Sequence, residues 1–438
     1  MGMNRILILI TVSILFITGC VNKEGTDEQK AGNKAASELE GYWEGTIDVP
    51  DQPLNINIEF NKEEEWSGTI SIPIQNVDRF SLSEIDVNGG KVSFQMPVPG
   101  QSIRFDGTMG EDELNGTFNQ AGQSFPFSLK KSDEIKEETG KGDFLSIETS
   151  TGTLYGELLL PEGKESAPVA LIIPGSGPTD RNGNSQSSPG KNDSLKLLAE
   201  GLAAQGIASL RYDKRGAGKN AEAVVDEKEM RFDIFIDDAK NWLELLESDK
   251  RFTDIAVIGH SQGSLVGMMA AGPETTEAFI SISGAGRPID QVLEEQLEQS
   301  LSEDLLSESR ALLENLRSGK EVSEVSEPLM GLFAPDVQPF LRSWMAYDPS
   351  EQLQELNVPT LLINGGHDLQ VPVEDAKLMN EASANNSETL IIEDMNHVLK
   401  QAPENREENL STYTDPDLPL AEGLVEGIID FLAKNDFN

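Results

Sequence analysis

The stretch IAVIGHSQGSLVGMMAA, residues 255–271, decides the fold of the longer part of this chain. Its first four residues are apolar, as in a buried strand, and residues 264–271 have the composition of a helix. Between them, Gly259-His260-Ser261-Gln262-Gly263 puts small residues two positions before and after a serine, where the backbone passes close to itself. The pattern predicts a sharp strand-to-helix turn that exposes the Ser261 hydroxyl at the start of the helix.

The same alternation of apolar strands and helical segments surrounds this turn over residues 145–438. Near-continuous apolar strands separated by helices predict a doubly wound, mostly parallel sheet covered on both faces, which is the α/β fold class. Residues 145–160 predict a hairpin that adds antiparallel strands at one edge. We expect strands at 169–173, 207–212, 255–258, 279–282, 360–363 and 389–392, and helices near 193–205, 230–248, 262–271, 374–384 and 419–434.

Residues 287–345 interrupt this alternation with a Leu- and Glu-rich stretch of helical character. Ligands bind outside the carboxyl ends of the strands in open α/β sheets, so a helical insertion in this part of the chain is expected to form a lid. Its large apolar side chains either line a substrate pocket or pack the lid onto the body, and the sequence leaves both open. They are Leu332, Phe333, Phe340, Leu341 and Trp344.

Residues 41–131 show a different pattern, the period-two alternation of half-buried strands. Leu54, Ile56, Ile58 and Phe60 alternate with polar residues, and turn signals such as Asn115-Gly116 lie nearby. Short strands at this spacing predict a small all-β barrel or sandwich. Whether this domain binds a ligand or serves as a spacer stays open. Residues 132–144 are expected to be a charged linker to the domain at 145–438.

Residues 1–20 have the organisation of a secretory signal, with Arg5 followed by an apolar run too short to span a bilayer. The run ends in Ile17-Thr18-Gly19-Cys20, which resembles the lipobox of bacterial lipoproteins. That resemblance implies lipidation of Cys20, so we expect a secreted protein anchored to the outer face of the bacterial cell membrane. Residues 21–40 would form a polar tether, and a plain signal peptide is the alternative.

The charge of the chain is strongly negative, with 76 acidic and 34 basic side chains and a net charge of -42. Such a surface repels the phosphates of nucleic acids, so we exclude nucleic acid as a partner. Acidity favours solubility and does not identify a substrate. Cys20 is the one cysteine, so an internal disulfide cannot form and packing must stabilise the fold.

A serine hydroxyl needs a base within hydrogen-bond reach to act as a nucleophile, and histidine is the usual base. The chain has three histidines. His260 adjoins Ser261, so its side chain is expected to point away from the hydroxyl, and His367 adjoins the expected acid. His397, just after the strand expected at 389–392, is therefore the predicted base.

The base needs a carboxylate that fixes its tautomer and stabilises its charged form. Asp368 follows the strand expected at 360–363, and the chain order Ser261, Asp368, His397 is the order typical of such sites. Asp394 is a rival acid only three residues before His397.

The predicted oxyanion hole needs two backbone N–H groups aimed at developing negative charge. Gln262, directly after the nucleophile, should supply one. The glycine-containing loop Pro174-Gly175-Ser176-Gly177-Pro178 should supply the other, from Ser176. A phosphate-binding loop is excluded because no Gly-Lys-Ser/Thr follows.

Several segments together resemble the α/β-hydrolase superfamily over about residues 145–435, and most of all bacterial lipoprotein esterases with a serine-aminopeptidase-like hydrolase domain behind a β-rich domain. The matching segments are 174–184, 211–218, the turn around Ser261, 344–349, 365–372 and 396–397. Pro174 departs from the pattern, since many relatives have His there. The resemblance implies hydrolysis of acyl esters, often of short chains, without a metal or organic cofactor. Asp213 and Arg215 are expected to be structural and to connect the active-site loops, with a functional role as the alternative that analogy offers.

The predicted function is therefore that of a serine hydrolase that cleaves short-to-medium carboxylic esters through an acyl-enzyme. An amidase or exopeptidase with the same three residues is one alternative, since the acyl-enzyme chemistry is shared. A tethered binding protein with a silent hydrolase domain is another.

Overall fold

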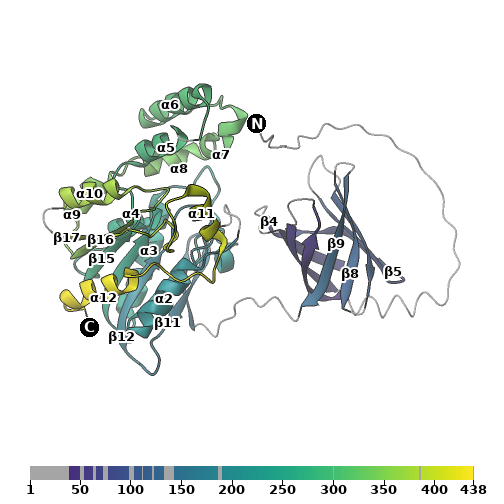
Figure 1. Cartoon of the computed structure of the whole chain (residues 1–438), viewed down its shortest axis with the longest axis horizontal. Helices are drawn as coiled ribbons and strands as arrows, with labels where there is room; N and C mark the ends of the chain where they lie inside the picture. Colours follow the sequence, from purple (N-terminus) through teal and green to yellow (C-terminus); the bar gives the residue numbers. More distant parts are fainter. Residues whose placement is uncertain are drawn as a thin grey trace. The chain divides into compact units, whose positions relative to one another are not determined.

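The structure, a computed structural model, describes residues 39–49, 54–62, 66–72, 77–97, 103–110, 112–120, 123–132, 143–185, 190–298, 300–383 and 386–437. The chain divides into two compact units, Met1–Gly140 and Lys141–Asn438, called here the N-terminal and C-terminal units (Figure 1). The predicted signal, with Cys20, and nearly all of the predicted tether and linker lie outside the described residues. None of the helices in the described ranges is long and apolar enough to cross a membrane.

The N-terminal unit is an antiparallel sheet that curls into a nearly closed barrel (Figure 1). Of the two predicted all-β architectures, the barrel is confirmed. The strand order is β4-β3-β2-β1-β9-β8-β7-β6-β5. The curl brings β5 close to β3, where a Cβ added to Gly68 would lie 3.3 Å from the Ile85 side chain. The strands are β1 (Gly41–Ile47), β2 (Leu54–Lys62), β3 (Trp66–Ile72), β4 (Val77–Ser81), β5 (Ser83–Asn88), β6 (Lys91–Met96), β7 (Ile103–Met109), β8 (Glu113–Gln120) and β9 (Gln123–Ser132).

Buried side chains alternate with more exposed ones along the strands, and the buried ones fill the inside of this barrel. Phe94 and Phe105 stack with ring centroids 4.6 Å apart, and Phe60 meets Phe94 edge-on at 5.2 Å. Trp43 is buried, and its indole N–H donates to the Leu39 carbonyl at 2.8 Å. Aromatic burial of this kind is a large apolar contribution to stability.

The C-terminal unit contains a mixed sheet in the order β10-β11-β13-β12-β14-β15-β16-β17. β10 and β11 form the predicted antiparallel hairpin, β11 is antiparallel to β13, and the remaining pairs are parallel. The strands are β10 (Asp143–Thr149), β11 (Gly152–Leu159), β12 (Ala167–Ile173), β13 (Ala208–Tyr212), β14 (Phe252–His260), β15 (Ala278–Ile282), β16 (Thr360–Gly365) and β17 (Ser387–Ile392). The predicted doubly wound, mostly parallel α/β fold is confirmed.

Helices cover both faces of this sheet (Figure 1). α2 (Ser194–Ala204) and α12 (Leu424–Lys434) share one apolar core with the sheet, and α3 (Asp233–Ser248), α4 (Gln262–Ala270), α9 (Pro349–Glu355) and α10 (Val373–Ala382) share the other. The helix expected at 419–434 begins only at Leu424, because Gly423 before it has a φ of 88° that a helix cannot continue. Short helical turns occur at Gly218–Asn220, Glu327–Leu329, Arg406–Ser411 (α11) and Thr412–Thr414.

The predicted helical insertion is present between β15 and β16 and has a small apolar core of its own (Figure 1). Its helices are α5 (Ile289–Glu298), α6 (Glu303–Arg317), α7 (Met330–Phe333) and α8 (Gln338–Trp344). Trp344 stacks on Phe232, just before α3, with ring centroids 5.4 Å apart, and the Ser343 hydroxyl accepts the Phe232 N–H at 2.8 Å. These contacts attach the end of the insertion to the body.

Candidate active site

Ser261 occupies the sharp turn between β14 and α4. Its φ of 53° and ψ of -121° are rare for a residue with a side chain, and the Ser261 N–H is fixed by the Ile282 carbonyl of β15 at 2.9 Å. The flanking glycines are needed for close approach. A Cβ on Gly259 would lie 2.2 Å from the Gly263 oxygen, and one on Gly263 would lie 2.3 Å from the Ile173 oxygen. The two glycines thus permit a turn so sharp that Ser261 stands at its tip, at the carboxyl end of the sheet.

His397 and Asp368 meet in the loops that follow β17 and β16. The Nδ1 of His397 lies 2.9 and 3.1 Å from the two carboxylate oxygens of Asp368, and both side chains are buried, at 6% and 0% exposed. The Gln370 and Val371 N–H groups also donate to Asp368, at 2.8 and 2.9 Å. Asp368 thereby holds the ring through Nδ1, and Nε2 has no hydrogen-bond partner among the described residues. The rival Asp394 is exposed.

The charge state of Asp368 follows from these contacts. Burial by itself would raise the pKa of Asp368, but the His397 ring and the two backbone N–H groups outweigh it and keep the pKa below its ordinary value. Asp368 is therefore a carboxylate at neutral pH, as the orienting role requires.

The other two histidines are engaged elsewhere. The His260 Nε2–H donates to the backbone carbonyl of His397 at 2.8 Å, and burial followed by the nearby His397 lowers the pKa of His260 to about 4. His260 is thus neutral and buttresses the loop of His397. Nδ1 of His367 bonds the Ala402 carbonyl at 2.6 Å. Both of these contacts are with backbone carbonyls, and neither involves Ser261.

Ser261 and His397 line one cavity of about 240 Å³, called here the polar cavity. No hydrogen bond joins the Ser261 hydroxyl to the His397 ring within the described part of the chain, and such bonds often tighten only when substrate binds. The pKa of Tyr413 is raised to about 12, mainly by burial and secondly by the negative charge of Asp368. Its phenol therefore stays a hydrogen-bond donor at neutral pH. The other lining residues are small or neutral: Gly175, Ser176, Gly177, Thr179, Gly183, Ser185, Gly190, Asn192, His260, Gln370 and Val398.

A second cavity of about 240 Å³ shares Ser261, Ser176 and Gln370 with the first and extends under the helical insertion; we call it the apolar cavity. Arg287 is its charged member, and Asp375 and Glu295 neutralise it at 2.7 and 2.6 Å. The remaining lining is mostly aliphatic: Gln262, Leu265, Ala285, Ile289, Val292, Leu293, Gln296, Leu332, Trp344, Pro349, Gln370 and Val371.

The residues predicted to line a pocket divide between two places. Leu332 and Trp344 line the apolar cavity. Phe333 does not line it, because its side chain is 0% exposed in the core of the insertion, where Leu341 is buried with it. Successive residues of α7 point in different directions, and sequence gave no signal of which one faces the body.

The two predicted oxyanion donors lie on either side of Ser261. A Cβ on Gly175 would be 3.4 Å from the Ser261 Cβ, so the Gly175–Ser176 peptide runs beside the serine. Gln262 is the first residue of α4, where a helix leaves its N–H groups without helical partners. Neither the Ser176 N–H nor the Gln262 N–H donates to another group among the described residues.

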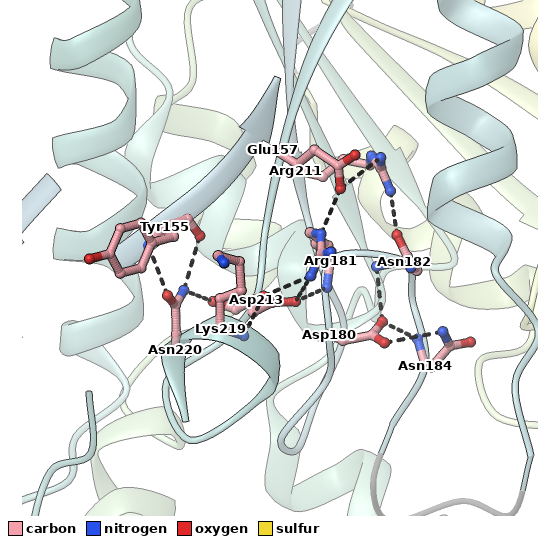
Figure 2. Close-up of polar contacts among 10 residues, drawn as sticks. All are labelled: Tyr155, Glu157, Asp180, Arg181, Asn182, Asn184, Arg211, Asp213, Lys219 and Asn220. Carbon is pink, nitrogen blue, oxygen red and sulfur yellow. Dashed lines mark hydrogen bonds and ion pairs between the residues drawn. The ribbon is translucent and has the colours of Figure 1, made fainter. Parts of the chain in front are cut away.

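A buried polar network holds the loop that carries Ser176 (Figure 2). Figure 2 shows Arg181 between two carboxylates, Glu157 of β11 at 2.6 Å and Asp213 after β13 at 3.1 Å. Asp213 also accepts the backbone N–H groups of Arg181 and Lys219, at 2.7 and 2.9 Å. These contacts show Asp213 in a structural position, since they connect the loops after β12 and β13 with strand β11 at the carboxyl end of the sheet.

The network continues along the same loop. Arg211 of β13 donates to Asn182 at 2.5 Å, and Asp180 accepts the N–H groups of Asn182 and Asn184, each at 2.9 Å (Figure 2). Arg215 lies apart from it and pairs with Asp238 of α3 at 2.6 Å. Sequence analysis missed Lys214, between Asp213 and Arg215, although a lysine two residues after an apolar strand was a signal. No group of three or more His, Cys, Asp or Glu within the described ranges could hold a metal ion.

A family model described as serine aminopeptidase, S33, matches residues 192–403, the range that contains Ser261, Asp368 and His397. This family match agrees with the order of the strands in the sheet and with the sharp turn at Ser261. The C-terminal unit has the fold of an α/β-hydrolase. The chain is 28% identical to Esterase EstD from Thermotoga maritima over 283 residues, which cover 64% of this chain and 66% of that protein. The match therefore spans slightly less than two thirds of the length of EstD.

Solved α/β structures are similar to this α/β-hydrolase at low sequence identity. Est1E from Butyrivibrio proteoclasticus is 18% identical with a TM-score of 0.43, covering 67% of this chain and 99% of that chain. A dienelactone hydrolase from Anabaena variabilis is 17% identical with a TM-score of 0.40, covering 67% of this chain and 97% of that chain.

Proposed function

We propose that this protein is a carboxylic-ester hydrolase that uses Ser261 as nucleophile, His397 as base and Asp368 as the orienting acid. The observation that carries the proposal is the buried contact of Asp368 with His397 Nδ1, at 2.9 Å, beside a cavity that Ser261 shares. The similarity to EstD, which is named an esterase, supports the same reaction.

In the proposed mechanism, the Ser261 oxygen attacks the ester carbonyl while His397 Nε2 takes the hydroxyl proton. The carbonyl oxygen becomes an oxyanion and accepts the N–H groups of Ser176 and Gln262. His397 then protonates the alcohol as its C–O bond breaks, which leaves an acyl group on Ser261. Water, deprotonated by the same histidine, attacks the acyl-enzyme and releases the acid.

Proton transfer assigns the two cavities to the two halves of the ester. The leaving alcohol must lie on the side of His397, which lines the polar cavity and not the apolar cavity. The acyl chain then extends the other way, under the lid, among aliphatic side chains such as Leu265 and Val292. A neutral polar lining suits a hydroxyl-bearing alcohol, and an apolar lining suits an acyl chain because it removes apolar surface from water.

The size of the apolar cavity favours a short-to-medium acyl group. Its volume of about 240 Å³ is below the range of roughly 300–1,000 Å³ that drug-sized ligands occupy. A long fatty acyl chain would have to leave the cavity and meet water.

The linings also favour an ester over the free end of a peptide. An exopeptidase that acts on an amino terminus needs a carboxylate to pair with the ammonium group. The described linings of the polar and apolar cavities contain no Asp or Glu side chain. Glu227 lines a separate cavity of about 390 Å³, which also borders Ser176 and Gln262 but does not include Ser261 or His397.

The test is fluorophosphonate labelling, followed by comparison of an ester and an anilide that carry the same acyl group. We expect one labelled site, at Ser261, and faster cleavage of the ester. Ser248→Ala, at an exposed serine near the end of α3, is the matched control and should label like wild type. A wild-type protein that does not label would favour the silent binding protein, and a preference for the anilide would favour an amidase.

We also propose that the mature protein is secreted and anchored by acylated Cys20 to the outer face of the bacterial membrane. The support is the sequence of residues 1–20. Cys20→Ser should prevent incorporation of labelled fatty acid and release the protein from the membrane fraction. A variant that stays in that fraction and still takes up label would contradict the proposal.

A further inference from the structure

Lys214 is a buried lysine two residues after the end of β13, and it is 5% exposed. Its Nζ donates to the Gly175 carbonyl at 3.0 Å and to the Gln262 side-chain oxygen at 2.6 Å, and it lies 4.0 Å from the centroid of the Phe235 ring. It forms no ion pair with a carboxylate among the described residues. The two hydrogen-bonded residues adjoin the candidate oxyanion donors: Gly175 precedes Ser176, and Gln262 is the other donor.

The contact with Gly175 fixes the direction of the Ser176 N–H. The Gly175 carbonyl and the Ser176 N–H belong to one peptide group, which is trans because the described chain contains no cis peptide. In a trans peptide the C=O and N–H bonds point in opposite directions. Because Lys214 binds the Gly175 oxygen, the Ser176 N–H of the same peptide points in the opposite direction, away from Lys214.

The second contact fixes the other donor residue. Lys214 holds the side chain of Gln262, whose backbone N–H begins α4 next to Ser261. One side chain thus bridges the loop after β12 and the turn after β14. The hydrogen bond to the Gly175 oxygen also polarises the peptide, which makes the Ser176 N–H a stronger donor.

Burial of this lysine is costly, so its position calls for a reason. Desolvation lowers the pKa of Lys214 to about 7, although the charge of Asp238 on α3 opposes the shift. The Asp238 carboxylate forms its ion pair with Arg215, at 2.6 Å, and not with Lys214. An apolar residue of similar length would fill the space without the desolvation cost, but it could not bind the Gly175 oxygen.

We propose that Lys214 is a positioning residue that holds the Ser176 and Gln262 N–H groups in place for the oxyanion of the reaction. The proposal rests on the proposed esterase function. Lys214 does not touch the substrate in this scheme and acts through the Gly175–Ser176 peptide and Gln262.

The test compares Lys214→Met, Lys214→Gln and the control Lys219→Met. Lys219 lies five residues further on the same loop, and its exposed side chain lies over the Phe144 ring, 4.8 Å from its centroid. Each variant is assayed for kcat and KM on a chromogenic ester. The inhibition constant is measured for an alkyl trifluoromethyl ketone, to which Ser261 adds with a new O–C bond, leaving an oxyanion and passing its proton to His397.

We expect Lys214→Met to lower kcat about 100-fold, in the range for loss of an oxyanion donor, with KM little changed. Affinity for the ketone should fall by about the same factor, since its adduct carries the same oxyanion. Lys214→Gln keeps one donor and should recover part of both losses. Lys219→Met should match wild type in both.

A merely structural role for Lys214 would give a different result. A folded Lys214→Met protein whose kcat and ketone affinity stay within about threefold of wild type would overturn the proposal. If the Met variant does not fold, Lys214→Gln decides through the same two measurements, kcat on the ester and affinity for the ketone. An equal loss of affinity for substrate and for ketone counts against the proposal. Wild-type protein without esterase activity would instead refute the proposed function.

Discussion

The two units of this protein bury different kinds of residue. Within the described residues, every buried polar or charged residue lies in the C-terminal unit, from Thr179 to Thr412. The barrel of the N-terminal unit buries apolar and aromatic side chains, and the one indole N–H of its core, on Trp43, is satisfied by the Leu39 carbonyl.

This difference teaches where the chemistry lies. A buried polar group destabilises a fold unless it is hydrogen-bonded, so a unit that retains many of them usually needs them for function. In the C-terminal unit they concentrate at the carboxyl ends of the strands, around Asp213, Lys214 and Asp368. The barrel shows no such concentration among its described residues, which is consistent with a role that depends on shape and packing.

The comparison predicts that the largest effect on activity comes from the C-terminal unit. Ser261→Ala should lower kcat by about a millionfold, since loss of the nucleophile removes the acyl-enzyme route. The measurement is turnover of a chromogenic ester by purified protein, with an unchanged thermal transition as the check on folding. Wild-type turnover in this variant would end the assignment.

Asp368→Asn should have the next largest effect. The amide keeps the shape of the side chain but favours the wrong tautomer of His397, so kcat should fall about 10⁴-fold. The pH dependence of kcat offers a further check, because the Asp368 carboxylate of the wild-type protein is ionised throughout the neutral range. A loss below about tenfold would favour a different acid, such as Asp394.

Phe105→Ala tests the other side of the comparison. Removing a ring that stacks on Phe94 at 4.6 Å should destabilise the barrel by about 3–5 kcal/mol. If the barrel depends on packing alone, kcat should stay at the wild-type level below the unfolding temperature. Calorimetry of the full chain and an esterase assay on the same sample measure both. A parallel fall of kcat would show that the barrel contributes to the reaction.

Leu332→Phe sharpens the assignment of the apolar cavity. The larger side chain should exclude the end of a longer acyl group and lower kcat/KM about tenfold for it, with little change for acetyl esters. Leu410→Phe is the control, because Leu410 is 44% exposed and does not line the cavity. An equal loss for every acyl length would contradict the assignment.

The last expected effect is a pH-dependent difference in stability between wild type and Lys214→Met, which changes little within any one pH unit. The folded pKa of about 7 lies below the ordinary value of 10.5, so above pH 7 the unfolded chain binds more protons at this site than the folded one. Wild type should therefore gain on the variant by about 1 kcal/mol per pH unit between pH 7 and 10. Denaturant unfolding of both proteins measures this, and parallel curves would refute it. Asp238 and Arg215 are the charged neighbours common to both proteins.

Local patterns in the sequence predicted much of the fold. The helix at Ser194–Ala204 and that at Gln262–Ala270 lie within two residues of their expected ranges. The order of the sheet did not follow from the sequence, because β13 inserts between β11 and β12 and this depends on where the chain crosses over. The same holds for Phe333 and Leu332, adjacent residues that face the core of the insertion and the cavity, respectively.

The sequence by itself determined the turn at Ser261 and the pairing of His397 with Asp368. The turn follows from neighbours in the chain, since only glycine fits at 259 and 263, and the pairing follows from chain order and the scarcity of histidine. Only the tertiary structure brought Lys214 to Gly175 and Gln262, which are 39 and 48 positions away. Such a contact depends on how strands and loops pack in space, and no local pattern specifies which distant carbonyl a buried lysine will meet.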